Sequence, residues 1–351
     1  MRLIYFFVII ISLLASCKKE PAAKAQEERL DERTEQNILR LARSYFTPLP
    51  QIEWDKMTPE RKKMVEIGKK LFYDKRLSGS MNVNCASCHD ISKYGVDNLP
   101  VSPGDKNQFG TRNTPTVLNA YLQYAQFWDG HARTVEEQCT GPIFGNFEMD
   151  MPDTATLISR LEADDYYPEA FAEAFPQADT AITIETVKRA IGAFERTLVT
   201  PGPFDKYLKG DLSAISTKAK MGIKSFADNG CIPCHSTSLV GGEMAQKFAL
   251  YGYYWDYTNS NYIDKGRYIR TGDTGDKFVF KVPMLRNVEK TYPYFHDGSV
   301  KDLEEAVKIM GMAETNIQLK QEDVDNILAF LKSLTGELPQ HAFEQNKLPW
   351  E

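Results

Sequence analysis

The stretch CASCH, residues 85–89, decides the fold of this chain, and it returns as CIPCH at residues 231–235. Two cysteines at this spacing can bond both vinyl groups of one haem, and the next residue then lies under the iron as its histidine ligand. Two copies in a chain with five histidines predict two covalently bound haem c groups. The predicted thioether residues are Cys85, Cys88, Cys231 and Cys234, and the predicted iron ligands are His89 and His235.

Redox dithiols and zinc sites also use Cys-x-x-Cys. A redox dithiol does not require histidine in the next position, and here histidine follows both pairs. A zinc site would have to join cysteine pairs that lie far apart in the chain, unlike the compact spacing of zinc modules. The haem interpretation therefore explains the pattern better than either alternative.

The surroundings of the two motifs are also similar. Thr58 followed by Pro59 is a helix start, and Ser216 begins a second helix of the same kind. Each helix leads into a CxxCH motif, which indicates an internal duplication separated by the breaker-rich segment 200–203. Further helical patterns cover residues 154–164, 183–198, 301–312 and 321–334. We expect a mostly α fold of two cytochrome c-like domains, each with one haem.

The N-terminus has the features of an export signal. Arg2 precedes a short apolar run, residues 3–14, which is too short to span a bilayer. Cys17 lies where a lipobox places the lipid-bearing cysteine, although an ordinary signal peptide with an incidental cysteine is the alternative. We expect a lipoprotein signal at 1–16, a solvated tether at 17–47, and a periplasmic protein that reaches the membrane only through its lipid.

The chain is acidic, with a formal net charge of −6. Loss of residues 1–16 would remove one arginine and make the charge more negative. This balance argues against nucleic acid as a partner, because nucleic-acid binding needs a basic face. Cys139 is the cysteine left over once Cys17 and the two pairs are assigned, and we expect it to be a small buried thiol.

Several separated motifs give the chain a resemblance to the bacterial di-haem cytochrome c peroxidases, from about residue 50 to residue 336. They are GKKLFYDKRLS, CASCH, TRNTPTVLNA, AQFWDG, EEQCTGPI with EM at 148–149, AFERTLVTP, CIPCH, VPMLRNV and TYPYFHDGSVKDLEEAVKIMG. The resemblance implies a peroxidatic haem in an N-terminal domain, 48–199. It implies an electron-transfer haem in a C-terminal domain, 200–336, and a tail, 337–351, able to pack back on the first domain.

The resemblance also implies an activity and partners. The enzyme would reduce hydrogen peroxide to water with electrons from a small soluble donor, a cytochrome c or a copper protein, and such enzymes are often homodimers. Glu148 would be the acid and base for peroxide cleavage, with Gln138 and Phe127 as its companions. Trp128 would assist electron transfer between the haem groups, although a tryptophan here can equally be core. In isolation Glu148 would read as a surface acid.

Met310 matches the sixth ligand of the second haem, and thioether ligation raises a haem potential. The alternatives are that Met310 is core, or that Met312 takes the role. The resemblance further implies a calcium ion between the domains, held by oxygen atoms of Asn113, Thr291 and Pro293, which suit calcium. His296 would lie near the electron-transfer haem.

One departure from the family concerns the distal side of the first haem. Many members hold a histidine there until the second haem is reduced, and the matching position in this chain is Asp105. No histidine occurs between residues 90 and 130, while Lys106 or water could ligate instead. His131 replaces an arginine common after FWDG, and we expect it either at the surface or just behind the residues of the site. We expect His341, in the tail, to be exposed to solvent. We therefore predict a first haem without a second histidine ligand and activity without reductive activation.

Two other functions remain open at this point. A plain di-haem electron carrier would leave Glu148 without a task. A di-haem oxidase of protein side chains, like the related methylamine-utilisation enzyme, would have tyrosine where Met310 stands.

Overall fold

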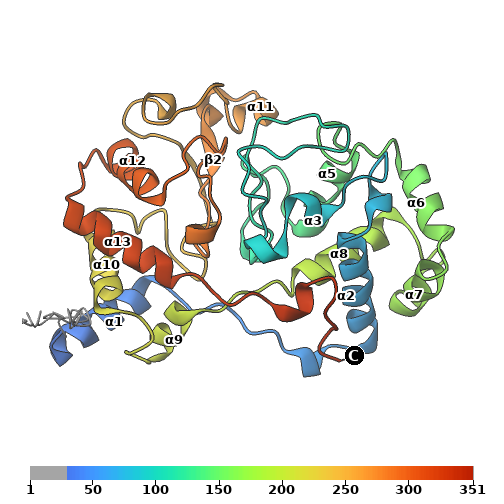
Figure 1. The fold of residues 1–351 in the computed structure, drawn as a ribbon, viewed down its shortest axis with the longest axis horizontal. Helices are drawn as coiled ribbons and strands as arrows, with labels where there is room; N and C mark the ends of the chain where they lie inside the picture. Colours follow the sequence, from blue (N-terminus) through green and yellow to red (C-terminus); the bar gives the residue numbers. More distant parts are fainter. Residues whose placement is uncertain (1–29, 351) are drawn as a thin grey trace, which may run out of the picture.

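The computed structural model describes residues 30–350, which form two lobes of helices joined by long irregular segments (Figure 1). The prediction of a mostly α fold is confirmed, since the described residues contain one small sheet, of β1 (Ala245–Lys247) antiparallel to β2 (Val279–Lys281). The helices are α1 (Glu32–Tyr45), α2 (Pro59–Phe72), α3 (Cys85–Cys88), α4 (Val135–Gln138), α5 (Thr140–Phe144), α6 (Thr154–Glu162), α7 (Tyr167–Ala174), α8 (Ile184–Glu195), α9 (Pro203–Lys209), α10 (Thr217–Asp228), α11 (Tyr268–Thr271), α12 (Leu303–Thr315) and α13 (Gln321–Ser333).

The expected export signal and Cys17 lie outside the described residues. Within residues 30–350, no helix is long and apolar enough to cross a lipid bilayer.

The two helices that lead into the CxxCH motifs begin as the sequence predicts. Thr58 caps α2 by accepting a hydrogen bond from the Arg61 N–H, with proline in the first turn. Ser216 caps α10 in the same way, through the Ala219 N–H. These caps satisfy backbone donors that a helix start leaves without a partner.

Both helices cross a partner helix at a glycine. A Cβ atom on Gly68 of α2 would lie 1.9 Å from the Ala190 carbonyl oxygen of α8. A Cβ on Gly222 of α10 would lie 2.0 Å from the Asn326 carbonyl oxygen of α13. The backbones therefore approach as closely as only glycine permits, and the crossing is repeated in the two lobes.

The first lobe, residues 54–199, has two neighbouring apolar clusters around α2 and α8. Ile67 and Leu71 of α2 pack with residues of α6, α7 and α8. Val65 and Phe72, on the other side of α2, pack with Phe194 of α8. Ala342 and Leu348 belong to this second cluster, so the C-terminal tail lies against the first lobe, as Figure 1 also shows.

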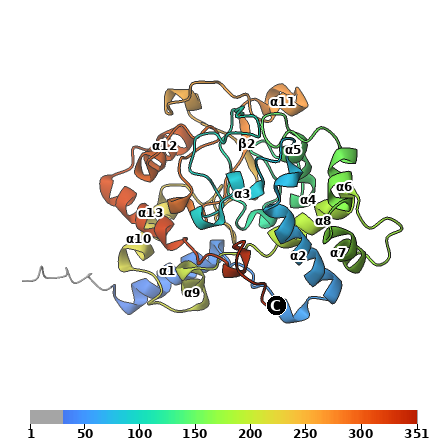
Figure 2. The ribbon, with the colours of Figure 1, turned by 45° about the vertical axis from the view of Figure 1, so that its right-hand side comes forward.

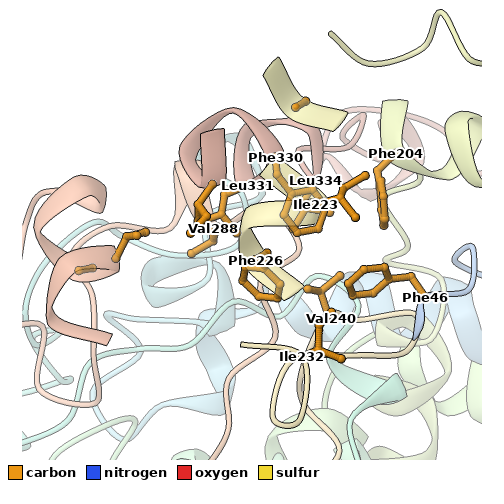
Figure 3. Packing of buried hydrophobic residues seen from close by; sticks show 14 of the residues in the cluster. Phe46, Phe204, Ile223, Phe226, Ile232, Val240, Val288, Phe330, Leu331 and Leu334 are labelled. Carbon is orange, nitrogen blue, oxygen red and sulfur yellow. The ribbon is translucent and has the colours of Figure 1, made fainter. Parts of the chain in front are cut away.

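The second lobe, residues 32–46 and 202–334, is built on one large cluster. Phe226 of α10 stacks edge-on against Phe330 of α13, with ring centroids 5.4 Å apart. Phe46 and Phe204 extend the same cluster (Figure 3). Ile232, inside the second CxxCH motif, is also a member, so the motif is fixed directly to this core.

The segment before this core differs from the expectation of a tether at 17–47. Residues 32–45 form α1, and Ile38, Leu39 and Ala42 are buried in the cluster of the second lobe. Figures 1 and 2 both show α1 beside α9. The tether prediction is wrong for this part, because its many charged residues concealed an apolar stripe at helical spacing.

The link between the lobes is held by two asparagines from equivalent motifs. The side-chain NH2 groups of Asn119 and Asn287 both donate to the Thr200 hydroxyl, at 2.8 and 2.9 Å. All three residues are buried or nearly so, and both asparagines have left-handed backbones. Thr200 begins the breaker-rich linker, which is therefore a fixed junction.

Candidate active site

The first CxxCH motif lines a cavity of about 670 Å³ in the first lobe. Cys85 and Cys88 occupy the single turn α3, which Asn84 and Ser87 stabilise through reciprocal capping hydrogen bonds. Both cysteines and His89 line the cavity, and the cysteines are not joined in a disulfide. The volume lies within the roughly 300–1,000 Å³ typical of cofactor and ligand sites.

The second motif lines a cavity of about 460 Å³ in the second lobe. Cys231, Cys234 and His235 lie on its wall with Met310 of α12. Met312 is absent from the residues that line this cavity. Of the two methionine candidates, Met310 therefore lines the cavity of His235, and Met312 does not.

The two motif histidines are held in the same way. The Nδ1 atom of His89 lies 3.2 Å from the Gly95 carbonyl oxygen, and that of His235 lies 3.2 Å from the Val240 carbonyl oxygen. Burial lowers the pKa of both rings, that of His235 to about 4, so the neutral form prevails at neutral pH. A neutral imidazole whose Nδ1–H bonds a carbonyl presents Nε2 as a metal ligand.

The second cavity contains further polar groups without partners. His296 is 2% exposed, and neither of its ring nitrogens has a hydrogen-bond partner in the structure. Its ring stacks on Phe280 at 4.3 Å and lines the cavity wall. Unbonded thiols, a neutral histidine, a thioether and an orphaned buried imidazole around one cavity fit a covalently attached haem.

Glu148 lies on the wall of the first cavity, together with Gln138 and Phe127. It follows α5, and its carbonyl oxygen accepts a hydrogen bond from the Asp105 N–H at 2.7 Å. Its side chain is open toward the cavity, while burial against protein raises the pKa of its carboxyl group. The charge of His131 acts in the opposite direction on this pKa.

Asp105 does not face the first cavity. Its carboxylate is 7% exposed and accepts a hydrogen bond from the Ser80 N–H at 2.7 Å. Lys106 is paired with Asp150, and neither Asp105 nor Lys106 is among the residues that line the cavity. The histidines on that wall are His89 and His131.

Trp128 lies between the two cavities, because it lines both of them. Its Nε1–H donates to the Asn113 carbonyl oxygen at 2.8 Å, which fixes the indole ring. Residues 113–116 and Phe127 line both cavities as well. These residues form a wall shared by both cavities, which we call the dividing wall.

The three expected calcium ligands lie close to this wall. Asn113, Thr291 and Pro293 all line the second cavity. The Asn113 NH2 group donates to the Leu99 carbonyl oxygen at 2.9 Å, which leaves its amide oxygen as the group able to face a cation. Among residues 30–350 no cluster of three or more acidic, histidine or cysteine side chains is placed to hold a metal ion.

Residues 62–213 match the family model described as di-haem cytochrome c peroxidase. The cytochrome c551 peroxidase of Pseudomonas aeruginosa is 43% identical over 305 residues, covering 85% of this chain and 86% of that protein. The chain belongs to the di-haem cytochrome c peroxidase family. The cytochrome c551 peroxidase of Nitrosomonas europaea is 44% identical, over 81% of this chain and 83% of that protein.

The family also includes proteins with other names. The methylamine utilization protein MauG of Methylophilus methylotrophus is 32% identical, over 77% of this chain and 82% of that protein. A crystal structure of a MauG-like protein associated with microbial copper homeostasis superposes with a TM-score of 0.73 at 28% identity. It covers 87% of this chain and 97% of that chain.

Two buried ionisable groups of this peroxidase-family chain were not singled out from the sequence. Glu195 lines the first cavity, and burial raises the pKa of its carboxyl group to about 8. Lys281 lines the second cavity, and burial lowers the pKa of its ammonium group to about 7. Glu195 lies inside the motif AFERTLVTP, and Lys281 directly precedes VPMLRNV. The available signal was therefore a charged residue within or next to a motif of the family.

Two further residues from the sequence analysis, Cys139 and His341, are held in place by the packing of the first lobe. Cys139 is buried, as expected, on the wall of the first cavity. His341, expected near the surface, is instead packed edge-on against Trp54 at 4.8 Å, with Nε2 3.0 Å from the Thr197 hydroxyl. The surface prediction for His341 is wrong, because the tail that carries it packs against the first lobe.

Proposed function

We propose that the chain is a di-haem peroxidase that reduces hydrogen peroxide to water with electrons from a small donor. The observation that carries this proposal is the position of Glu148 in the same cavity as His89, separated by the dividing wall from the cavity of His235 and Met310. When bound, the two haem groups would receive the electrons and activate the peroxide.

The residues that would hold the haem groups are those of the two motifs. Cys85 and Cys88 would form the thioethers in the first cavity, with His89 as iron ligand. Cys231 and Cys234 would do the same in the second cavity, with His235 and Met310 as the two iron ligands. The resulting architecture is one haem in each lobe, with domains at 48–199 and 200–336.

Glu148 would move the proton during peroxide cleavage. Its carboxylate would accept a proton from one oxygen of peroxide and return it to the other oxygen, which departs as water. Each turnover consumes two electrons and two protons and leaves two water molecules. Burial raises the pKa of Glu148, which is the direction that favours this task, because a general acid and base works best when its pKa approaches the working pH. Gln138 and Phe127 would shape the same wall.

Trp128 would assist the passage of electrons across the dividing wall. It contacts both cavities, and its hydrogen bond to Asn113 holds the ring in one orientation. Asn113, Thr291 and Pro293 would hold a calcium ion beside this wall through amide and carbonyl oxygens.

We further propose that the enzyme works without reductive activation. The side chain of Asp105 is engaged with backbone N–H groups and does not line the first cavity. His131 does line it, but its Nδ1 is bound to Asp129. The first haem iron of the oxidised protein would then be five-coordinate or water-bound, with a high-spin EPR signal. A purely low-spin spectrum would contradict this proposal. If the low-spin signal of the first haem then disappeared in His131→Gln, His131 would be the second ligand of that haem.

The proposals on export and anchoring rest on the N-terminal sequence, and those on the electron donor and assembly rest on the family resemblance. We propose a periplasmic lipoprotein anchored through Cys17, which takes electrons from a cytochrome c or a copper protein and can form a homodimer. A di-haem carrier without peroxidase activity is the less favoured function, since it gives Glu148 no task. A MauG-like oxidase is less favoured because a methionine, Met310, faces the second cavity.

The experiment that tests the proposal is peroxide turnover by the Glu148→Gln variant. We expect a loss of roughly 100-fold or more, the contribution typical of a positioned acid and base. Glu169→Gln is the matched control, because Glu169 is exposed on α7 and lies outside both cavities. An unchanged rate in Glu148→Gln would remove this residue from the mechanism.

A further inference from the structure

Lys281, the last residue of β2, is a buried lysine on the wall of the second cavity. The residue is 5% exposed, and its strand lies on the side of the second lobe that faces the first lobe (Figure 1). Moving a charged ammonium group from water into a protein costs free energy unless an opposite charge and hydrogen bonds replace the water. The partners of this ammonium group therefore decide what the site can bind.

Gln123 is the side chain that the ammonium group contacts. The Lys281 Nζ atom donates to Oε1 of Gln123, which is itself 7% exposed and lines the same cavity. An ammonium group has three N–H donors, whereas an amide oxygen carries no net charge. Among residues 30–350, no carboxylate is paired with Lys281, and no second acceptor is bonded to its Nζ atom. Two donors and a positive charge are therefore left without a protein partner.

Backbone hydrogen bonds fix both sides of this site. The Lys281 N–H donates to the Trp128 carbonyl oxygen at 2.6 Å, and the Tyr124 N–H donates to the Gly242 carbonyl oxygen at 3.0 Å. Residues 123–128, which belong to the first lobe, are thereby held along the second lobe. The buried ammonium group thus has a defined position beside the dividing wall.

The other charged groups of this cavity do not balance Lys281. Glu314 is the acidic residue among those that line it, and Lys247 and Lys281 are the basic ones. Burial raises the pKa of Glu314, whose Oε1 atom accepts a hydrogen bond from the Ala249 N–H at 2.8 Å, and the charge of Lys247 acts in the opposite direction on this pKa. When all three groups are ionised, the wall carries one positive charge in excess, and Lys281 is the one without a carboxylate.

We propose that Lys281 binds a propionate carboxylate of the second haem, with Gln123 holding the ammonium group in place. This inference rests on the proposed haem in the second cavity and does not require peroxide turnover. A carboxylate accepts hydrogen bonds at both oxygens and supplies the missing negative charge. Burial lowers the pKa of Lys281 to about 7, and an adjacent carboxylate would favour the charged form again.

The test compares the midpoint potential of the second haem in the wild-type, Lys281→Met and Lys281→Arg holoenzymes. Methionine removes the charge, whereas arginine keeps it. A positive charge favours the reduced haem, so Lys281→Met should weaken electron acceptance roughly tenfold, the effect of one hydrogen bond to a charged group. This equals a fall of about 59 mV for a one-electron couple. Lys281→Arg should lose less than half of that amount.

Lys277→Met is the matched control, because Lys277 is exposed in the same lobe and does not line the cavity. Its potential should equal that of the wild type. An unchanged potential in Lys281→Met, with the second haem in place, would overturn the role of Lys281. A protein that reduces no peroxide would reject the peroxidase function, and the potentials would still decide the role of Lys281.

A second readout distinguishes pairing from the effect of a more distant charge. The resonance Raman band of the haem propionates responds to their hydrogen bonds, and half-reduction separates the signals of the two haem groups. The band of the second haem should shift in Lys281→Met and stay in place in Lys277→Met. A lowered potential with an unshifted band would overturn the pairing.

The variant without the lysine charge could also fail to retain the second haem. Its absorbance should then be recovered in Lys281→Arg but not in Lys281→Gln, because only arginine restores the charge. Loss of the haem in all three variants would show that Lys281 is needed for packing and would contradict the inference.

Discussion

Trp128 donates its indole N–H to the Asn113 carbonyl oxygen at 2.8 Å, on a wall that both cavities share. This hydrogen bond orients the ring between the two sites. Trp128→Phe keeps an aromatic ring but leaves the Asn113 carbonyl without this donor. We expect stopped-flow electron transfer between the two haem groups to slow by roughly tenfold, equivalent to about 1.4 kcal/mol in the barrier.

Trp255→Phe is the control for this experiment, because Trp255 lines neither cavity. Its transfer rate should equal that of the wild type. Equal rates in both variants and the wild type would show that Trp128 is a packing residue only.

Met310 faces the same cavity as His235, whereas Met312 does not. Met310→His should lower the midpoint potential of the second haem, because a thioether ligand raises the potential. A shift on the order of 0.1 V is expected, within the ~0.8 V range that axial ligands span. Met312→Leu, two residues along α12, should leave the potential measured by redox titration unchanged. A shift in Met312→Leu without one in Met310→His would reverse the assignment.

Arg286 and Asp205 form a buried ion pair in the second lobe. The guanidinium donates to both carboxylate oxygens, at 2.8 and 3.0 Å, and both side chains are almost fully buried. Asp205→Ala would strand the buried Arg286 charge and should lower the free energy of unfolding by about 3–5 kcal/mol.

The exposed pair of Lys218 with Asp325, at 2.9 Å, provides the matched comparison. Asp325→Ala should cost at most about 1 kcal/mol, since exposed pairs are solvated and screened. Denaturant unfolding measures both values. Similar losses in the two variants would contradict the structural importance of the buried pair.

Arg112 joins the lobes by bonding Asp129 of the first lobe and Asp264 of the second. Burial opposes ionisation of both aspartates, but their hydrogen bonds and the Arg112 charge lower both pKa values. Carboxylates with a lowered folded pKa stabilise the fold above their unfolded pKa of about 4, and this stability is lost as the pH falls further.

Thermal unfolding at a series of pH values tests this link. The wild type should lose stability below about pH 4 more steeply than Asp264→Asn, which lacks one of the titrating groups. At neutral pH, Asp264→Asn should already be the less stable protein. Parallel curves for the two proteins would show that Asp264 does not contribute through its charge.

The sequence predicted those features that depend on neighbouring residues. The caps Thr58 and Ser216, the helices that they begin and the two CxxCH turns are local, and each was recognisable by spacing alone. The hydrogen bond from the Ser80 N–H to the Asp105 carboxylate could not be predicted, because it depends on how the loop that carries Asp105 folds back onto residue 80.

The features that were missed result from contacts between distant segments. The apolar stripe of α1 matters only because Phe204 and Phe330 lie beside it in the fold. Likewise, Asp129, Arg112 and Asp264 come together from different parts of the chain, so the sequence could not show that His131 adjoins this cluster. Resemblance placed Glu148 in a role, while the structure placed it in the cavity of His89.

The most direct test of the whole account is steady-state peroxide turnover with a reduced cytochrome c, measured on the fully oxidised and on the half-reduced holoenzyme. The account predicts that the oxidised enzyme turns over at once, with no lag, and that half-reduction beforehand does not raise the rate. Turnover only after half-reduction would contradict activity without a switch. Absence of turnover in both states would contradict the peroxidase function itself.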